Sequence, residues 1–315
     1  MSEKINDVAI EKKGKKKKVV TIIVSCLLAA LVIGGLAFHF WLKSTGKIIV
    51  PEFTQIAEDT YAYSEGMNQT NIYLLVGEER AVLIDTGNGL LELDEAVSKI
   101  TDKPVFIINT HGHYDHIGGN RFYEEAWVPK LDEELFHFNN SGGGINSYYE
   151  DLSSFMMLFN KYNLRTILAI ERPDTANYYT AGDIFDLGGR TLSTIALYGH
   201  TAGSTGMIDS KTGYLFCGDA LVPVDAGLLM NLPESITIAE YREHLIELQK
   251  LVDDGTVTKL FSGHSDTFSM ETDGVAKFIT ICDNIISGKL TDKEKDNCKA
   301  GYEGVYICYN PDKIQ

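Results

Sequence analysis

The sequence predicts an α/β fold in which helices lie outside a central pair of sheets, preceded by one transmembrane helix. Three observations predict this architecture. Strand-like pairs alternate with amphipathic segments along two rough halves of the chain. Apolar residues make up 44% of the 315 positions, enough for a sizeable core. Residues 19–42 contain no Lys, Arg, Asp or Glu.

The N-terminal uncharged run is long enough to cross the hydrocarbon layer as a helix. The basic run "KKGKKKK" at 12–18 precedes it. The positive-inside rule therefore predicts a cytoplasmic tail at 1–18, a signal-anchor helix at 19–42, a linker at 43–49 and an extracytoplasmic domain at 50–315, held at the cell membrane. A cleaved signal peptide is the alternative, but the run is longer than such peptides and no clear A-x-A site follows it.

The first half of the domain begins with strand signals. Residues 70–87, "TNIYLLV-GEE-RAVLIDTG", predict a β-hairpin, and 90–100 have helical spacing with acid early and Lys late. The apolar run "PVFIINT" at 104–110 is typical of a strand buried on both faces. After it, 117–125 and 128–140 predict a helix start and a further helix.

The second half repeats this alternation. Residues 140–180 start as a Gly-rich link and continue as an aromatic, Met-rich helix, either an insertion over a site or a core helix. Later strands are expected in 184–199, 205–221 and 259–265, with a turn at "DSKTG", and helices in 237–255 and 274–290. Cys298 and Cys308 flank a further hairpin candidate, and whether they pair stays open.

The charge of the chain excludes some partners. Its formal net charge is −16; residues 1–42 carry seven Lys against three acidic residues, a net of +4, so the remainder carries −20. Such an acidic surface repels phosphate backbones and argues against nucleic acid as a partner. A small-molecule substrate is expected, besides the membrane contact of the N-terminal helix; the oligomeric state stays open.

Side chains that bind metals follow the apolar runs at five places. They are Asp85 in "VLIDTG", the cluster "HGHYDH" at 111–116, His200 in "YGHTAGS", Asp219 in "LFCGDAL" and His264 in "LFSGHS". Strand ends are where α/β proteins build sites, and imidazole and carboxylate groups are zinc ligands. Because His111 and His113 are two apart, an extended loop points both to one side. Gly118 and Gly119 are expected to let the backbone turn sharply after the cluster.

The cluster resembles the HxHxDH motif of the metallo-β-lactamase superfamily, and the other four positions follow that family's order from about residue 50 to 270. The resemblance implies a four-layer αβ/βα sandwich with two Zn²⁺ ions, Fe or Mn being alternatives. It implies that His111, His113 and His200 hold one metal, that Asp115, His116 and His264 hold the other, and that Asp219 bridges both. Asp85 would orient a ligand by a hydrogen bond.

The bridging position also indicates a branch of the family. The β-lactamases commonly carry Cys or Ser there, whereas Asp219 resembles the glyoxalase II and lactonase branch. Cys217, two residues earlier, is interpreted as a packing residue. The remaining histidines His39, His137 and His244 are not expected to be ligands.

The resemblance implies a hydrolase in which a metal-bridging hydroxide attacks an ester, lactone or thioester carbonyl, with Asp115 and Asp219 passing a proton to the leaving group. A tyrosine is a candidate to stabilise the oxyanion: Tyr198 and Tyr114 lie beside ligands in the sequence, and four others lie in or near 140–180, namely Tyr148, Tyr149, Tyr178 and Tyr179. Tyr198 is the named candidate.

The substrate class is less constrained. The aromatic segment favours an apolar acyl chain. The absence of a clear basic cluster, together with the extracytoplasmic location, favours a lactone or ester over a glutathione thioester. An iron-dependent redox enzyme, a phosphodiesterase and a non-catalytic membrane-tethered binding module are the alternatives.

Overall fold

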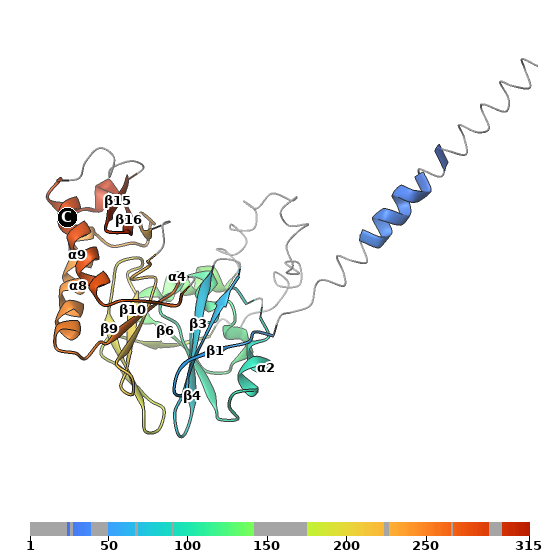
Figure 1. Ribbon diagram of the computed structural model, residues 1–315, viewed down its shortest axis with the longest axis horizontal. Helices are drawn as coiled ribbons and strands as arrows, with labels where there is room; N and C mark the ends of the chain where they lie inside the picture. The colour runs from blue at the N-terminus through green and yellow to red at the C-terminus, as the bar shows by residue number, and fades with distance from the viewer. Residues whose placement is uncertain are drawn as a thin grey trace, which may run out of the picture. The chain divides into compact units, whose positions relative to one another are not determined.

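The computed structural model describes residues 24–25, 28–38, 50–66, 69–89, 91–141, 175–223, 227–265, 267–289 and 298–315 (Figure 1). The chain divides into two units, residues 1–47 with 154–163 and residues 48–153 with 164–315. In the first unit, residues 24–25 and 28–38 are helical. Among the described helices, none combines the length and apolarity that a bilayer crossing requires. The expected tail at 1–18, the linker at 43–49 and much of the expected span at 19–42 lie outside the described residues, so the anchor stays a prediction.

The second unit begins with a seven-stranded sheet in which the strands lie in sequence order. They are β1 (Thr54–Ala57), β2 (Thr60–Glu65), β3 (Thr70–Val76), β4 (Ala81–Ile84), β5 (Val105–Ile108), β6 (Ala126–Pro129) and β7 (Asn177–Tyr179). Strands β1 to β4 are antiparallel, and β4 to β7 are parallel. The expected hairpin at 70–87 and the buried strand within 104–110 are confirmed.

A six-stranded sheet faces the first, with the order β14-β13-β11-β10-β9-β8. Its strands are β8 (Ile184–Asp186), β9 (Thr191–Ala196), β10 (Thr205–Asp209), β11 (Tyr214–Gly218), β13 (Lys259–Ser262) and β14 (Ser269–Met270). The turn expected at "DSKTG" joins β10 to β11. The pair β11 and β13 is parallel, so the ends of these two strands meet at one edge of the sheet.

Helices cover the outer faces of both sheets. Tyr73 of the first sheet packs between Phe216 and Phe261 of the second, with ring centroids 4.8 and 5.7 Å apart, and forms part of the core between the sheets. Helix α2 (Leu93–Ser98) packs outside the first sheet, and α8 (Ile238–Asp253) and α9 (Asp273–Ile286) pack outside the second. The expected α/β arrangement of helices outside two sheets is therefore confirmed.

The region after the histidine cluster differs from expectation. The helix expected to start in 117–125 begins earlier, as α3 (Tyr114–Ile117), and is followed by the 3₁₀ turn η1 (Asn120–Phe122). Residues 128–140 start as the end of strand β6, because this strand pairs with β5, and pass through η2 (Lys130–Asp132) into α4 (Glu133–Asn140).

Gly118 and Gly119 serve close packing rather than a sharp turn. Gly118 has helical dihedral angles, with φ −60°, and Gly119 has φ −91°. A Cβ on Gly118 would lie 2.3 Å from the carbonyl carbon of Asn88, and one on Gly119 would lie 2.6 Å from the Thr86 oxygen. The two glycines therefore allow the segment after β4 to pack against α3.

The C-terminal segment forms a third, three-stranded sheet. The expected hairpin consists of β15 (Lys299–Tyr302) and β16 (Val305–Tyr309), followed by η4 (Pro311–Lys313). The sequence did not predict β12 (Leu228–Met230), which pairs in parallel with β16. Cys298 and Cys308 remain thiols rather than halves of a disulfide. Of the expected insertion at 140–180, residues 142–174 lie outside the described part.

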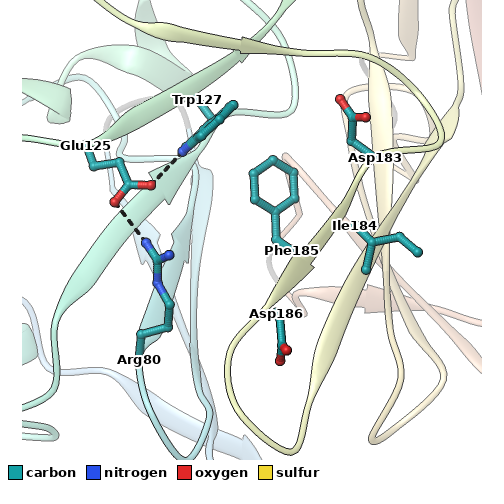
Figure 2. A pocket seen from close by; sticks show the side chains of 7 residues that line it. All are labelled: Arg80, Glu125, Trp127, Asp183, Ile184, Phe185 and Asp186. Carbon is teal, nitrogen blue, oxygen red and sulfur yellow. Dashed lines mark hydrogen bonds and ion pairs between the residues drawn. The ribbon is translucent and has the colours of Figure 1, made fainter.

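A groove of about 460 Å³ lies between the starts of β4 and β6 in the first sheet and the edge strand β8 of the second (Figure 2). Arg80, Glu125 and Trp127 line one side, and Asp183 to Asp186 line the other. The Glu125 carboxylate accepts hydrogen bonds from Arg80 at 2.9 Å and from the Trp127 indole at 2.8 Å. None of the expected metal ligands lines this groove, so it is separate from the site described next.

Candidate metal centre

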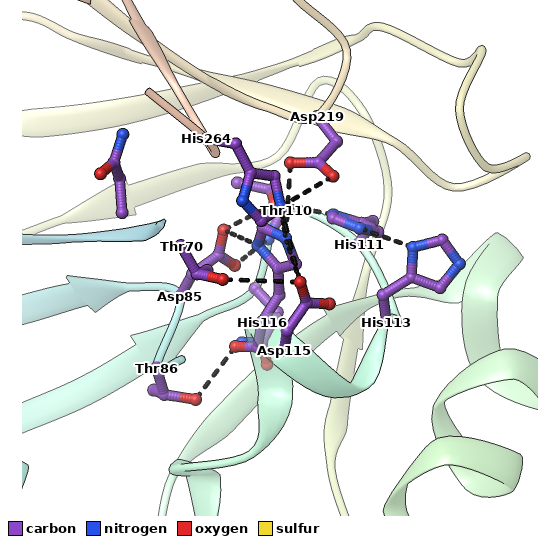
Figure 3. Close-up of polar contacts among 12 residues, drawn as sticks. Thr70, Asp85, Thr86, Thr110, His111, His113, Asp115, His116, Asp219 and His264 are labelled. Carbon is purple, nitrogen blue, oxygen red and sulfur yellow. Dashed lines mark hydrogen bonds and ion pairs between the residues drawn. The ribbon is translucent and has the colours of Figure 1, made fainter. Parts of the chain in front are cut away.

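The candidate ligands converge because they follow strands of the two facing sheets that end on the same side of the domain (Figure 3). Asp85 follows β4, and His111 comes three residues after the parallel neighbour β5. On the facing sheet, Asp219 directly follows β11 and His264 comes two residues after its parallel neighbour β13. His200 lies in the loop after β9. The five sequence positions are thus brought to one place.

Six of the seven expected ligands form two triads, and Asp219 is the seventh. Candidate ligand atoms lie within 4.8 Å of one another in the group His111, His113 and His200, in the group Asp115, His116 and His264, and in the group His111, His116 and Asp219. The first triad has His113 Nδ1 3.0 Å from His111 Nε2 and 2.9 Å from His200 Nε2. Tetrahedral ligands about 2.1 Å from a zinc ion are about 3.4 Å apart, so these nitrogens lie within about half an ångström of the spacing that a shared cation would impose.

Asp219 lies between the two triads. Its Oδ2 is 3.5 Å from His200 Nε2 and 3.2 Å from His264 Nε2, and its Oδ1 is 3.4 Å from His116 Nε2. Oδ1 is buried without a hydrogen-bond partner among the described residues. A buried carboxylate oxygen in this position is costly unless a cation compensates it, so the residues present fit a metal centre.

The second triad is held together in the same way. His116 Nε2 lies 3.3 Å from His264 Nε2, and His264 Nε2 lies 3.5 Å from Asp115 Oδ2 (Figure 3). Two imidazole nitrogens that face each other at this distance are suited to a shared cation.

Hydrogen bonds outside the cluster select the tautomers that metal binding needs. His200 Nδ1 donates to the Leu229 carbonyl at 2.7 Å, and His116 Nδ1 donates to Asp85 Oδ2 at 2.8 Å. His113 Nε2 donates to Glu234 Oε1 at 2.6 Å. Each of these three histidines therefore directs its other nitrogen to the interior of the cluster, where that nitrogen, once free of a proton, presents its lone pair.

Asp85 organises two ligands at once. Its Oδ1 accepts from the Thr110 amide at 2.8 Å, and its Oδ2 accepts from the Thr110 hydroxyl at 2.8 Å as well as from His116. The Thr110 oxygen lies 3.0 Å from His111 Nδ1 and can accept that proton in turn. Asp85 has φ +60°, an uncommon conformation for a residue with a Cβ, and these hydrogen bonds stabilise it there.

Charge within the cluster favours cation binding. Burial lowers the pKa of His111 well below its usual value and, helped by the nearby His113, lowers the pKa of His200 to about 4, so both imidazoles are neutral. Burial acts to raise the pKa of Asp219, but His264 and His116 outweigh it and hold that pKa well below the usual range. His111, His200 and Asp219 are therefore in the states that bind metal, whereas burial acts to lower the pKa of His116 and His264 but Asp219 outweighs it and raises both, so a metal would displace protons from these two histidines.

Asp132 was not found by sequence reasoning. This buried carboxylate accepts hydrogen bonds from the Gly112 amide at 2.9 Å, the Gly203 amide at 2.8 Å and the Thr201 hydroxyl at 2.8 Å. It therefore ties the loop of His111 and His113 to the loop of His200. A Cβ on Gly203 would lie 2.5 Å from the Asp132 Cγ. The glycine in "GHTAGS" is therefore the sequence feature that could have indicated a close neighbour at this loop.

The tyrosine candidates have other neighbours. The Tyr198 ring packs against His244 on α8, with centroids 4.9 Å apart, and makes no polar contact with the cluster among the described residues. Tyr179 is buried and donates to the Asn109 carbonyl at 2.7 Å, and the Tyr178 hydroxyl lies 3.1 Å from His137 Nε2. Tyr148 and Tyr149 lie outside the described residues. An oxyanion role for Tyr198 stays a prediction.

Cys217 is a packing residue, as expected. It is buried, and its Sγ contacts the Phe261 carbonyl at 3.1 Å instead of joining the ligands. His137 and His244 likewise contact the tyrosines named above rather than the cluster.

Two packed sheets with outer helices, and a histidine–aspartate centre where strands from both sheets end, define an αβ/βα protein with a candidate metal centre. The sequence profile of the Metallo-beta-lactamase superfamily matches residues 66–264, and the chain belongs to that superfamily. The expected α/β metallo-β-lactamase fold and the expected hydrolase class are thereby confirmed, whereas the transmembrane helix that was expected to precede the fold stays a prediction.

Relatives and solved structures agree with this assignment. The chain is 29% identical over 221 residues to the human acyl-coenzyme A thioesterase MBLAC2, covering 66% of this chain and 77% of the relative. It is 26% identical over 161 residues to a hydroxyacylglutathione hydrolase of Synechococcus, covering 51% of this chain and 52% of the relative. A metallo-beta-lactamase family protein from Thermus thermophilus shares the fold with a TM-score of 0.52 at 19% identity, covering 74% of this chain and 82% of that one.

Proposed function

We propose that the protein is a dinuclear zinc hydrolase that cleaves an acyl thioester or ester at its carbonyl carbon. The observation that carries the proposal is Asp219, whose two oxygens lie 3.2 to 3.5 Å from histidines of both triads. His111, His113 and His200 would hold one ion, Asp115, His116 and His264 the other, and Asp219 would contact both. Ions bound there supply Lewis acidity, which lowers the pKa of a water molecule and polarises a carbonyl oxygen.

The chain's own carboxylates supply the proton transfers. Burial acts to raise the pKa of Asp115, but His116 and His264 outweigh it and the net shift is downward, so the group is ionised. An ionised Asp115 accepts a proton as water adds to the carbonyl and returns it to the leaving thiolate or alkoxide. Asp219 Oδ1, buried without a hydrogen-bond partner among the described residues, is the second candidate for this role.

The choice of thioester rests on the comparisons. Sequence alone favoured a lactone or ester, because it has no clear basic cluster for a glutathione group. The relative named as an acyl-coenzyme A thioesterase covers two thirds of this chain and 77% of its own length, and it favours an acyl thioester here. Asp219 supports a hydrolase outside the true β-lactamases.

A substrate panel tests the proposal. The purified full chain, with its metal content measured, would be assayed on short- and long-chain acyl-coenzyme A, aryl esters, lactones, a phosphodiester and a β-lactam. We expect thioester hydrolysis that His113→Ala abolishes and that the matched variant His244→Ala leaves in place. Turnover of the phosphodiester or β-lactam alone, or iron with oxygen uptake, would contradict the proposal.

The N-terminal segment completes the proposal. The uncharged run at 19–42 after the basic run at 12–18 supports a single-pass anchor with a cytoplasmic N-terminus and the hydrolase domain on the other side of the cell membrane.

A further inference from the structure

One short stretch of chain supplies the outer hydrogen bonds of two histidines in the first triad. The Leu229 carbonyl accepts from His200 Nδ1 at 2.7 Å, and Glu234 Oε1 accepts from His113 Nε2 at 2.6 Å. The same stretch also contacts the His200 loop, because the Ser235 hydroxyl donates a hydrogen bond to the His200 carbonyl at 2.8 Å. Residues 229–235, here named the 229–235 loop, thus orient one side of the centre.

The C-terminal segment holds the 229–235 loop in place. Strand β12, whose last two residues begin the loop, pairs in parallel with β16, with Leu228 opposite Ile307. Lys313 then reaches back with its ammonium group, which donates to the Pro233 carbonyl at 2.8 Å and to the Ser235 carbonyl at 2.7 Å. These two carbonyls flank Glu234 on both sides. The ammonium therefore fixes the backbone that aims the Glu234 carboxylate.

The contact between Glu234 and His113 has the geometry of an orienting hydrogen bond. The side chains are 26% and 14% exposed, so the pair is largely shielded from water. With Nε2 donating to Glu234, the His113 lone pair is on Nδ1, the atom that lies 3.0 and 2.9 Å from the two other histidines of the triad. A carboxylate behind a histidine ligand fixes the ring and makes its free nitrogen a stronger donor.

We propose that Glu234 is a positioning residue that aims His113 Nδ1 into the first metal site, and that Lys313 of the C-terminal segment fixes the loop that carries Glu234. This inference rests on the proposed metal centre. It assigns a role to residues 298–315, which lie outside the part of the chain that matches the superfamily.

Zinc affinity of the purified full chain, measured by competition with a chromogenic chelator, tests the proposal without an activity assay. We expect Glu234→Ala to weaken Zn²⁺ binding by about 10-fold to 100-fold, as is usual for the loss of such a partner. Glu234→Gln keeps an oxygen acceptor and should lose much less. The matched control Glu243→Ala, on an exposed residue of α8, should bind as the wild type does. The melting temperatures of the metal-free variants should agree with that of the wild type.

Lys313→Met tests the second link. We expect a smaller loss of Zn²⁺ affinity than for Glu234→Ala, and a loss in the double variant that is smaller than the sum of the two single losses, because Lys313 acts on His113 through Glu234. Lys250→Met, an exposed lysine of α8, is the control.

Three results separate the outcomes. Equal affinities of Glu234→Ala and Glu243→Ala would overturn the positioning role while leaving the proposed hydrolase intact. A fully additive double variant would overturn the link through Lys313. A wild-type chain that binds no Zn²⁺ would overturn the proposed function and this inference together.

Discussion

At the scale of single residues, carboxylates determine the orientation and the tautomer of histidines in the centre. Asp219 joins the two triads, Asp85 orients His116, and Glu234 orients His113. A histidine-rich motif names candidate ligands, but the tautomer of each ring depends on the acceptor behind it. The sequence predicted the first two of these carboxylates and missed Glu234, because its partner lies 121 residues away and no local pattern marks the contact.

Asp132 is the residue whose loss we expect to loosen the centre without removing a ligand. In Asp132→Asn the amide nitrogen would face backbone N–H donors and leave at least one of them unsatisfied, which costs about 1–3 kcal/mol of stability. Urea denaturation measures this loss, and the chelator competition should show weaker Zn²⁺ binding. Asp102→Asn, at an exposed position, is the control. Stability within 0.5 kcal/mol of the wild type, as an approximate limit for surface changes, would refute a tying role for Asp132.

At the scale of elements, a buried ion pair joins the two main sheets at the edge opposite the metal centre. Arg190, just before β9, forms a two-pronged contact with Asp209 at the end of β10, at 2.6 and 2.9 Å. The same guanidinium donates to the Thr60 hydroxyl of β2 at 2.7 Å and to the Asp59 carbonyl at 2.8 Å. The sequence predicted β9 and β10 but neither β2 nor this cross-sheet contact, which spans 130 residues.

Removing one partner of this pair should be strongly destabilising. Arg190→Met leaves the Asp209 carboxylate buried without its counter-charge, and we expect the free energy of unfolding to fall by about 3–5 kcal/mol. Arg242→Met removes a more exposed ion pair with Asp283 on α9 and should cost less than about 1 kcal/mol. Equal losses in the two variants, measured by urea denaturation, would contradict this account.

The same pair has a predictable pH dependence. Burial acts to raise the pKa of Asp209, but the hydrogen bonds from Arg190 and Thr212 outweigh it and the net shift is downward. Its contribution is therefore complete above the unfolded-state pKa of about 3.9 and is lost as the pH falls through the lower folded value. The stability difference between wild type and Arg190→Met should be largest near neutral pH and shrink as the pH falls through the acid range, where Asp209 becomes protonated in both proteins. A difference that grows in acid would have the wrong sign.

At the scale of the whole molecule, the sequence pattern predicted which kinds of element occur better than it predicted short elements and element boundaries. The alternation of strands and helices predicted helices outside a central pair of sheets. The resemblance of the five ligand positions to the superfamily then implied the αβ/βα sandwich. The third sheet was missed, because the three residues of β12 are too few for a pattern and are defined only by pairing with β16. Strand β6 was taken for part of a helix for a similar reason, since it is four residues long and runs directly into η2 and α4.

The predicted membrane anchor concerns the whole molecule, and a cell-based experiment tests it. Full-length chain expressed in cells should stay in the membrane fraction after an alkaline carbonate wash and be released by detergent. Protease added outside intact cells should reach the domain at 50–315. Recovery of the full chain in the wash, or complete protection in intact cells that is lost on lysis, would argue against the predicted topology.

The central claim is that two metal ions share Asp219. Titration of Zn²⁺ into the metal-free full chain, with bound metal measured by mass spectrometry, tests it most directly. The account predicts about two equivalents per chain for the wild type, from its two triads, and fewer for Asp219→Ala, with thioester hydrolysis lost in that variant. A wild type that saturates at one equivalent, or an Asp219→Ala variant that still binds two and still hydrolyses thioesters, would contradict it.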